Sequence, residues 1–461
     1  MDGLVVDYYI PDRLNEGYGL NKDAIEKIVS EKYSLIITVD CGITAIEEID
    51  FANRYNVDVI VTDHHEPGEL LPSAYAIVDA KIKNSIYPFR ELAGVGVVFK
   101  LIQAIGIKAS LEEKEYLKYL DLVCIGTISD IVPLRSENRV IAKLGLRLVE
   151  ETKNIGLKTL IKTCGYKRID SFAISFGVAP RINASGRIGT PQDAIELFLT
   201  DNVLRAEQIT KGLNDYNLKR QEEEKKILTE VNSKLDKMDI NNISTLVVAG
   251  ENWHHGVIGI VASKIAEKYF KPTILLSYED EIAKGSGRSI PGFDLHSALL
   301  DSSEYLDKYG GHEMAVGVTL NKKNIAPFVQ KLEEVSKTQE LKDIKPIITI
   351  DEEITFENLN KKTISDIKLL EPFGEGNRTP VFVYKNLKIE SIRSISEGKH
   401  LKLTLKDGGN TINGIAFGLG SLSNEYQIDD KIDVVGNLEI NVYNNIETIQ
   451  MNIKDIMKSY K

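Results

Sequence analysis

The sequence predicts a multidomain α/β protein with a parallel-sheet unit, a second α/β unit and a small antiparallel barrel at the carboxyl end. Three observations lead to this class. Residues 1–80 alternate between short apolar strands and amphipathic helices, as a parallel sheet with crossover helices does. A second alternation of this kind starts near residue 239, and β runs joined by turns fill the chain after residue 346. A chain of 461 residues is also too long for one hydrophobic core.

In the first unit, short runs such as LIITVD and VDVIVTD are apolar along their whole length, which is typical of strands buried on both faces. Residues 91–200 are mostly helical in pattern and end in the polar, glycine-rich stretch GVAPRINASGRIG. We expect strands at 4–10, 35–40, 57–63 and 74–80 and helices at 21–33 and 43–55, within a first domain of residues 1–200.

Residues 201–238 are highly charged and almost free of Gly and Pro, which predicts a long, exposed connecting helix. A second α/β domain is expected over 239–340, with AKGSGRSIPG (283–292) as a loop. The β runs of 346–461 are joined by turns such as KDGGN and predict a barrel of the OB type.

Composition sets limits on the function. The net charge of −11 argues weakly against a nucleic-acid ligand, although a local basic groove remains compatible with it. No apolar run approaches the ~20 residues that span a bilayer, and the first residues lack the features of a signal peptide. Three widely spaced cysteines indicate a reducing environment, so we expect a cytoplasmic protein without membrane contact.

Acidic side chains and a histidine pair follow the apolar runs of the first domain. Asp40 ends one predicted strand, and Asp63 ends the next, one strand–helix–strand period later and directly before His64 and His65. Asp130 follows another apolar run, in GTISDIVPL. Ligands collect at the carboxyl ends of parallel strands, and carboxylates with imidazole suit Mn²⁺ or Mg²⁺. Either strand-end aspartate alone is better explained as a helix cap, but the set with two histidines predicts a metal site.

These motifs resemble a known family. TVDCGI, VTDHH and GTISDIVPL are similar to the second, third and fourth motifs of the DHH phosphoesterases. YYIPDRLNEGYGLN, PRINASGRIG, GSGRS and YGGH narrow the resemblance to the RecJ exonucleases, which degrade single-stranded DNA from the 5′ end. The resemblance covers essentially the whole chain, and it implies a DHH domain, a DHHA1-like domain and an OB-type barrel.

The resemblance also implies roles for individual residues. Asp40, His64 and Asp130 would be metal ligands, Asp63 would orient the neighbouring histidine, and His65 would stabilise charge on the scissile phosphate. The implied nucleic-acid contacts are Arg187, Arg288, Ser289 and His312, with Phe382 and Tyr384 either stacking on bases in the barrel or packing in its core.

One family motif is not found. The family has an Asp-x-Asp shortly after an N-terminal strand, and Asp2, directly before the predicted strand, does not fit that pattern. We therefore expect the chain to be a fragment of a longer protein, or to begin at a misassigned start. On this hypothesis the parent enzyme is active and the 461-residue chain lacks full activity.

The function implied is metal-dependent 5′→3′ hydrolysis of single-stranded DNA to mononucleotides in DNA repair and recombination, by a monomer that works with single-strand-binding protein and a helicase. Two alternatives stay open. A non-catalytic DNA-binding relative would have kept the fold and lost the chemistry, which the retained ligand motifs disfavour. A phosphodiesterase for short oligonucleotides or cyclic dinucleotides would not need the C-terminal barrel.

Overall fold

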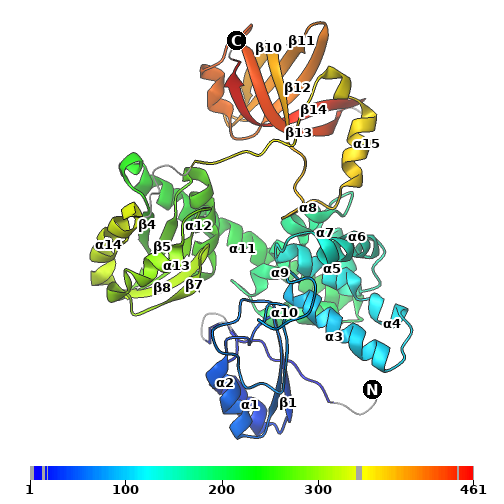
Figure 1. The fold of residues 1–461 in the computed structure, drawn as a ribbon, viewed down its shortest axis with the longest axis vertical. Helices are drawn as coiled ribbons and strands as arrows, with labels where there is room; N and C mark the ends of the chain where they lie inside the picture. Colours follow the sequence, from blue (N-terminus) through cyan, green and yellow to red (C-terminus); the bar gives the residue numbers. More distant parts are fainter. Residues whose placement is uncertain (1–4, 13–15, 18, 339–344, 444–445, 460–461) are drawn as a thin grey trace. The chain divides into compact units, whose positions relative to one another are not determined.

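The computed structural model describes residues 5–12, 16–17, 19–338, 345–443 and 446–459 (Figure 1). It divides into two compact units. The first comprises the chain up to Asp130 and Gly145–Pro346, and the second comprises Ile131–Leu144 and the chain from Ile347 onward. The predicted α/β class is confirmed, as is a carboxyl-terminal β-barrel, although one of its strand pairings is parallel and the others are antiparallel.

The amino-terminal sheet has three parallel strands in the order β1 (Leu35–Val39), β2 (Asp58–Thr62) and β3 (Ala76–Val78). Helices α1 (Lys22–Ser30) and α2 (Ile46–Arg54) cover one face, where Ile25 and Ile49 pack against Val59 and Val61. The predicted burial on both faces is wrong for β1, because its other face leaves three apolar side chains about half exposed: Leu35, Ile37 and Val39.

The strand predicted over residues 4–10 is not formed in its described part. Leu4, like Asp2, lies outside the described residues, and Val5–Ile10 have no strand geometry. The side chains of Val5 and Val6 are 80% and 82% exposed. An apolar, β-branched run forms a strand only when a neighbouring strand pairs with its backbone, and the described residues provide none here.

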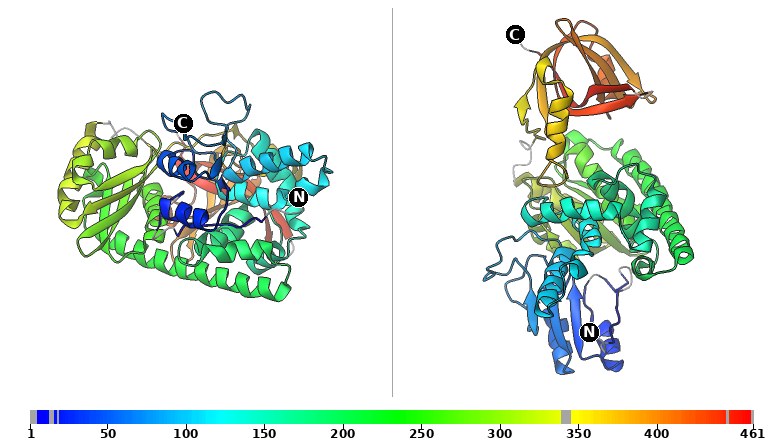
Figure 2. Two further views of the ribbon diagram at one scale, coloured as in Figure 1. Left: turned by 90° about the horizontal axis from the view of Figure 1, so that it is seen from below. Right: turned by 90° about the vertical axis from the view of Figure 1, so that its right-hand side faces the viewer.

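A group of helices follows the first sheet, as predicted, and leads into the long helix α11 (Val203–Leu235) (Figure 2). The predicted exposure of α11 is wrong for one side, since Leu213, Ile227 and Val231 are fully buried. The helices between β3 and α11 are α3 (Gly94–Lys108), α4 (Lys114–Leu117), α5 (Leu120–Ser129), α6 (Ser136–Glu150), α7 (Ile155–Cys164), α8 (Ser171–Ala173), the π-helix η1 (Ile174–Val178), α9 (Ala179–Ser185) and α10 (Pro191–Leu199).

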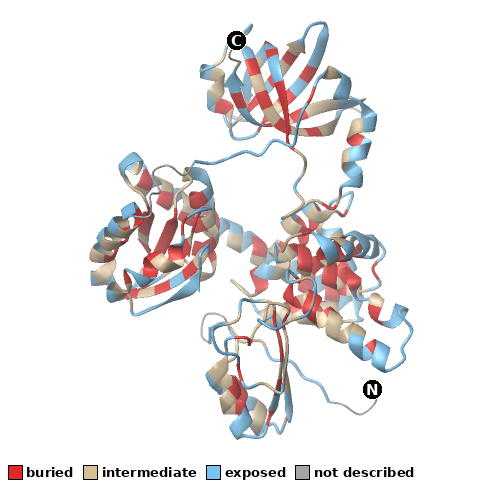
Figure 3. Ribbon diagram, in the orientation of Figure 1, coloured by how far each residue is buried: buried red, intermediate tan, exposed pale blue. Residues whose placement is uncertain are grey.

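The second sheet has five strands in the order β4-β5-β6-β8-β7 and separates two apolar layers. Helix α12 (His255–Tyr269) and the end of α11 pack on one face, and α13 (Leu295–Leu300) and α14 (Ile325–Thr338) pack on the other. Figure 3 shows the resulting band of buried residues through this sheet. The strands are β4 (Leu246–Glu251), β5 (Thr273–Glu279), β6 (Ile282–Arg288), β7 (Lys308–His312) and β8 (Ala315–Asn321).

The glycine-rich sequence predicted as a loop over 283–292 is a strand over most of its length. β6 pairs antiparallel with both β5 and β8. A Cβ atom on Gly285 would lie 2.4 Å from Leu276, and one on Gly287 would lie 2.6 Å from Val316. The glycines are therefore required by close packing across the strand and do not mark a turn.

The carboxyl-terminal unit contains a closed five-stranded barrel, in agreement with the predicted OB type. Its strands are ordered β11-β12-β14-β13-β10, and β10 also pairs with β11 to close the barrel. Phe382 and Tyr384 are 9% and 3% exposed and belong to its core. Their predicted stacking on bases is therefore wrong, and the core alternative holds. The strands are β10 (Phe382–Ile395), β11 (His400–Asp407), β12 (Asn410–Ala416), β13 (Lys431–Tyr443) and β14 (Ile446–Lys458), with the short β9 (Glu352–Glu353) beside β10 and helix α15 (Lys361–Leu369) before it.

Candidate metal centre

Asp40 stands at the carboxyl end of β1, directly after Val39. Its backbone φ of 62° lies in the left-handed region, which non-glycine residues adopt rarely. Its N–H donates to the Thr62 carbonyl at 2.9 Å, so the residue stays anchored to the neighbouring strand. Sparsely populated backbone conformations of this kind concentrate at functional sites.

Gly94, the first residue of α3, makes room for the Asp40 carboxyl group. A Cβ atom on Gly94 would lie 2.4 Å from Oδ1 of Asp40 and 2.8 Å from its Cγ. Any side chain at position 94 would therefore displace the carboxylate. Sequence analysis missed this residue, because a glycine within the largely helical pattern of residues 91–200 carries no functional group.

Asp63 follows β2 and is 1% exposed. Its carboxylate accepts hydrogen bonds from the N–H groups of Ile43 (3.0 Å), His64 (2.7 Å) and His65 (3.2 Å), and it bonds to the His65 ring at Nδ1 (2.7 Å). Burial acts to raise the pKa of Asp63, but the hydrogen bonds from His65, Ile43 and His64 outweigh it and lower the pKa to about 2. Asp63 is thus an ionised, buried group that fixes the orientation of His65.

The imidazole of His64 lies between two carboxylates. Its Nε2 atom is 3.0 Å from Oδ1 of Asp40 and 3.5 Å from Oδ2 of Asp130. Asp130 directly follows α5, and the next residue, Ile131, has a left-handed φ of 61°. Burial raises the pKa of Asp130, a cost that a bound cation would relieve. Three residues that are far apart in the sequence thus converge at one point.

The donor atoms at this point suit a divalent cation. Asp40, His64 and His65 each offer one ligand atom, and these atoms all lie within 4.8 Å of one another. Carboxylate oxygen and imidazole nitrogen are the ligands that Mn²⁺ accepts, with carboxylate also suited to Mg²⁺. His65 lies beside His64, with ring centroids 4.6 Å apart.

The His65 ring is held in a field of negative charge. The hydrogen bond to Asp63 raises the pKa of His65, burial lowers it, and the charges of Asp63, Asp40 and Asp130 raise it further. The net direction is upward, which favours the imidazolium form. A cationic donor at this position can stabilise negative charge on a phosphate.

Asp79 is a further strand-end carboxylate that sequence analysis did not single out. It follows β3 directly, as Asp40 follows β1, and is 5% exposed. Its Oδ1 accepts the Lys81 N–H at 2.7 Å, whereas Oδ2 is buried and has no hydrogen-bond partner among the described residues. Burial raises the pKa of Asp79, and the charge of Asp63 adds to this. The strand-end position in AYAIVDA was the signal that could have identified it.

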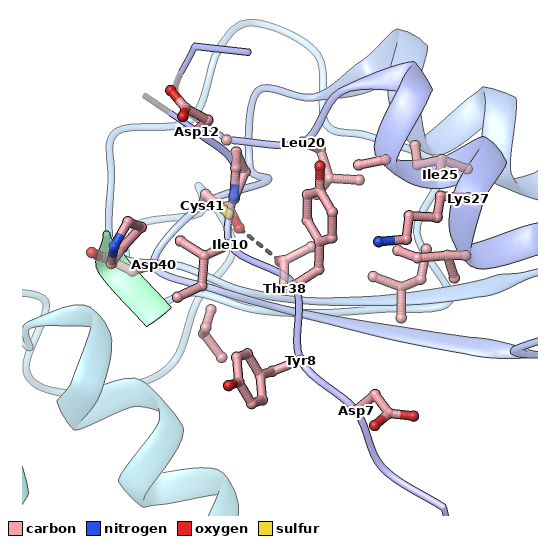
Figure 4. A pocket seen from close by; sticks show the side chains of 18 of the residues that line it. Asp7, Tyr8, Ile10, Asp12, Leu20, Ile25, Lys27, Thr38, Asp40 and Cys41 are labelled. Carbon is pink, nitrogen blue, oxygen red and sulfur yellow. Dashed lines mark hydrogen bonds between the residues drawn. The ribbon is translucent and has the colours of Figure 1, made fainter. Parts of the chain in front are cut away.

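A cavity of about 700 Å³ lies beside the metal-ligand candidates (Figure 4). Its lining includes Asp40 and Cys41 at the end of β1, every residue of the segment Asp7–Asp12, and Arg187. Burial, together with the charges of Asp63 and Asp40, raises the pKa of Cys41 to about 11. Its thiol is therefore protonated near neutral pH.

Of the predicted nucleic-acid contacts, the two arginines are held by hydrogen bonds, the histidine is exposed and the serine is buried. Arg187 donates to the Gly256 carbonyl at 3.1 Å, and Arg288 donates to Ser286 Oγ (3.0 Å) and to the Gly287 carbonyl (2.7 Å), so both guanidinium groups are oriented by the protein. His312 has an exposed side chain, but partial desolvation of its ring, together with the charges of Arg288 and His65, lowers its pKa.

Ser289 does not fit its predicted role. Its side chain is buried, and its hydroxyl donates to the Phe293 carbonyl at 2.7 Å. Its N–H donates to the Met314 carbonyl at 2.9 Å. These bonds stabilise the turn after β6, so we correct the prediction that Ser289 lines the path of a nucleic-acid strand.

Comparison with known proteins identifies the family. Three family models match this chain: the N-terminal domain of the DHH family over residues 1–127, the DHHA1 domain over 242–338 and the RecJ OB domain over 350–455. The single-stranded-DNA-specific exonuclease RecJ of Haemophilus influenzae is 32% identical over 445 residues, which cover 90% of this chain and 76% of that protein. The chain belongs to the RecJ family. This confirms the resemblance predicted from the motifs.

Two further RecJ proteins agree in sequence and in structure. The RecJ exonuclease of Bacillus subtilis is 38% identical over 98% of this chain, and the chain spans 57% of that protein's length. A crystal structure of RecJ from Thermus thermophilus in complex with Mn²⁺ matches with a TM-score of 0.84 and 29% identity over 96% of this chain and 64% of the crystallised chain. A second crystal structure of the Thermus protein is a complex with Mg²⁺. These are the two ions that the donor types predicted.

Proposed function

We propose that this chain provides the catalytic and strand-binding parts of a metal-dependent exonuclease that hydrolyses single-stranded DNA from the 5′ end to mononucleotides. The observation that carries the proposal is the convergence of Asp40, His64 and Asp130, with His64 Nε2 at 3.0 Å and 3.5 Å from the two carboxylates. Clusters of titratable groups with perturbed pKa values concentrate at functional sites.

In the proposed reaction, water attacks the phosphorus in line and a phosphodiester bond breaks. Asp40, His64 and Asp130 would hold Mn²⁺ or Mg²⁺, which when bound lowers the pKa of water and neutralises phosphate charge. His65, in its imidazolium form, would donate a hydrogen bond to the phosphate oxygen that gains charge. Asp63 would keep the His65 ring in place through the 2.7 Å contact at Nδ1.

Residues of the first domain and of the second α/β domain would hold the substrate together. Arg187 and Arg288 present guanidinium groups whose positions are already fixed by hydrogen bonds to protein oxygens. Preorganised donors of this kind bind phosphate without a large loss of side-chain entropy. His312, near the charges of Arg288 and His65, would approach the same phosphate region.

The remaining predictions extend this proposal to the cell. We propose action in the cytoplasm, in DNA repair and recombination, by a monomer that receives its strand from a helicase and single-strand-binding protein. The substrate class supports this setting, and the three cysteines are free thiols, as in a reducing compartment. Among the described helices, none is long and apolar enough to cross a membrane.

The metal site can be tested without relying on catalysis. Titration with Mn²⁺, followed by electron paramagnetic resonance of the free ion, should show binding to the unsubstituted 461-residue chain, which is called the parent in the comparisons with variants below. The substitution His64→Ala should weaken it at least tenfold, whereas His400→Ala in the barrel should leave it unchanged. A saturating ion at about 100 times its Kd should also raise the free energy of unfolding by about 2.7 kcal/mol. Equal Mn²⁺ binding by the parent and by His64→Ala would overturn the metal assignment.

The activity itself is tested with end-labelled DNA. Single-stranded substrates carrying a label at either end, together with the matching duplex, are incubated with the full chain and Mn²⁺. Whatever hydrolysis the chain supports, at a full or a reduced rate, should release the 5′ label as a mononucleotide, with little attack on duplex. Release from the 3′ end, or equal hydrolysis of duplex, would contradict it.

A further inference from the structure

Three aromatic side chains form an exposed cluster on the helical part of the first unit. Phe172 and Phe176 are 58% and 65% exposed, and Tyr166 is 38% exposed. The Phe172 and Phe176 ring centroids lie 4.6 Å apart, and Tyr166 meets Phe172 edge-on at 6.3 Å. Neighbouring exposed rings of this size indicate a binding surface, since the same area would be more stable when buried.

The backbone below this aromatic cluster is shaped to hold it. α8 passes into the π-helix η1, a rare conformation that is frequent at functional sites. A Cβ atom on Gly177 would lie 2.5 Å from Cε2 of Tyr166, so the glycine allows the ring to rest on the helix. Arg181 donates to the Gly177 carbonyl at 2.8 Å and to Oδ1 of Asn214 at 3.1 Å, which ties the π-helix to α11.

The same stretch of chain is strongly basic. Residues 153–187 contain seven lysines and arginines and one acidic residue, although the whole chain has a net charge of −11. Lys158 and Lys162 are exposed and stand at positions i and i+4 of α7, and the exposed Lys167 adjoins Tyr166. The one acid, Asp170, is occupied as a helix cap, because its Oδ1 accepts the Ala173 N–H at 2.9 Å.

We propose that the aromatic cluster, Tyr166, Phe172 and Phe176, is a stacking platform for the bases of single-stranded DNA, with the lysines of α7 contacting its phosphates. This inference rests on the proposed function and adds a second contact region to it. Exposed rings beside a basic surface are the combination that binds single strands without sequence preference. An acidic peptide would match the charge but would not require a row of aromatic faces.

A short helical segment links the platform to the cavity beside Asp40. The helical path continues from Phe176 through α9 to Ser185, about 14 Å at the ~1.5 Å rise per helical residue. Arg187, shortly after the end of α9, lines the cavity beside Asp40. The platform would therefore hold nucleotides several positions away from the hydrolysed bond and would matter for long substrates only.

The test is binding of 20-nucleotide oligothymidylate by fluorescence anisotropy, in EDTA so that no hydrolysis occurs. The double substitution Phe172→Ala with Phe176→Ala should weaken binding about tenfold or more, since stacking on an aromatic ring is strong and sequence-independent. The matching Phe→Tyr pair should bind like the parent. Leu199→Ala, which also removes an exposed apolar side chain in this unit, should have no effect.

Two further probes separate stacking from other causes. An abasic strand of the same length and a trinucleotide should bind the parent and the double alanine variant equally. Substitution of Lys158 and Lys162 by alanine should reduce the slope of log affinity against log salt by about 0.7 for each phosphate that is no longer neutralised. Thermal unfolding checks that each variant is folded.

The outcomes are distinguishable. If the parent binds oligothymidylate and the double alanine variant binds it equally well, the platform is refuted and the proposed function stands. An equal loss on the abasic strand would also refute stacking. If the variant loses affinity only for a glutamate-rich peptide, the surface binds protein and the proposal fails. If the parent binds no single-stranded DNA, the platform and the proposed function fail together.

Discussion

Replacement of Gly94 by alanine should disable the metal centre while the protein stays folded. The added methyl group would lie 2.4 Å from Oδ1 of Asp40, whereas ordinary contacts begin at 3.4 Å. The carboxylate must therefore move by about 1 Å, or α3 must shift at its first residue. Changes to groups that orient a metal ligand typically weaken metal binding about 10–100-fold, so we expect a loss of Mn²⁺ affinity in that range.

The fold should tolerate the same substitution. Alanine is favoured over glycine in a helix by up to about 1 kcal/mol, and a steric overlap in a packed region costs about 1–3 kcal/mol. The net change in the free energy of unfolding should thus stay within about 2 kcal/mol. Gly96→Ala is the matched control in the same helix, because the closest approach of its Cβ would be to Cδ2 of Leu92, at 3.3 Å, and its other contacts with that side chain are of ordinary length.

The assay is Mn²⁺ titration by electron paramagnetic resonance, with urea unfolding of each variant in EDTA. We expect Gly94→Ala to approach the Mn²⁺ affinity of Asp40→Ala, and Gly96→Ala to match the parent. If Gly94→Ala binds Mn²⁺ as tightly as the parent does, then Asp40 is not a metal ligand, or its carboxylate binds the ion from a position other than the one in the structure. Equal losses in both glycine variants would point to a general effect on α3.

Three other predictions concern single contacts. Asp63→Asn should lower the free energy of unfolding by about 3 kcal/mol in urea, because N–H groups that face a carboxylate lose a charged acceptor. This difference in the free energy of unfolding should persist above pH 4 and disappear as the pH falls through about 2, because the Asp63 carboxylate, whose pKa is lowered to about 2, becomes protonated there. A difference that stays constant over this pH range would contradict the prediction. Gly287→Ala should lower stability by about 1–3 kcal/mol by overlap with β8, whereas Gly317→Ala has open space; equal melting temperatures would refute the strand assignment. Tyr384→Phe should lower the free energy of unfolding by about 1–2 kcal/mol, because the 2.7 Å hydrogen bond to Asp407 is lost; an unchanged free energy of unfolding would contradict it.

The sequence predicted those parts of the fold that depend on local patterns. Uninterrupted apolar runs between amphipathic helices were sufficient to locate β1 and β2, and a parallel sheet places both strand ends on one edge. That geometry brings Asp40 and His64 together, although the whole of α2 and β2 lies between them in the chain. The prediction failed where pairing decides the structure: GSGR is a strand because β5 and β8 flank it, and no local property of Gly285 or Gly287 reveals those neighbours.

The candidate metal centre shows the same division between local and distant causes. Its ligand types could be read from short motifs, because carboxylates and imidazoles are chemically distinctive wherever they occur. Its shape depends on Gly94, which is distant from Asp40 in the sequence and carries no functional group. A glycine that provides space leaves no chemical trace in one sequence, so only the packed structure can reveal it. The precision of the site is therefore set by residues that sequence reasoning passes over, and substitutions at such positions are the sharpest test of the geometry.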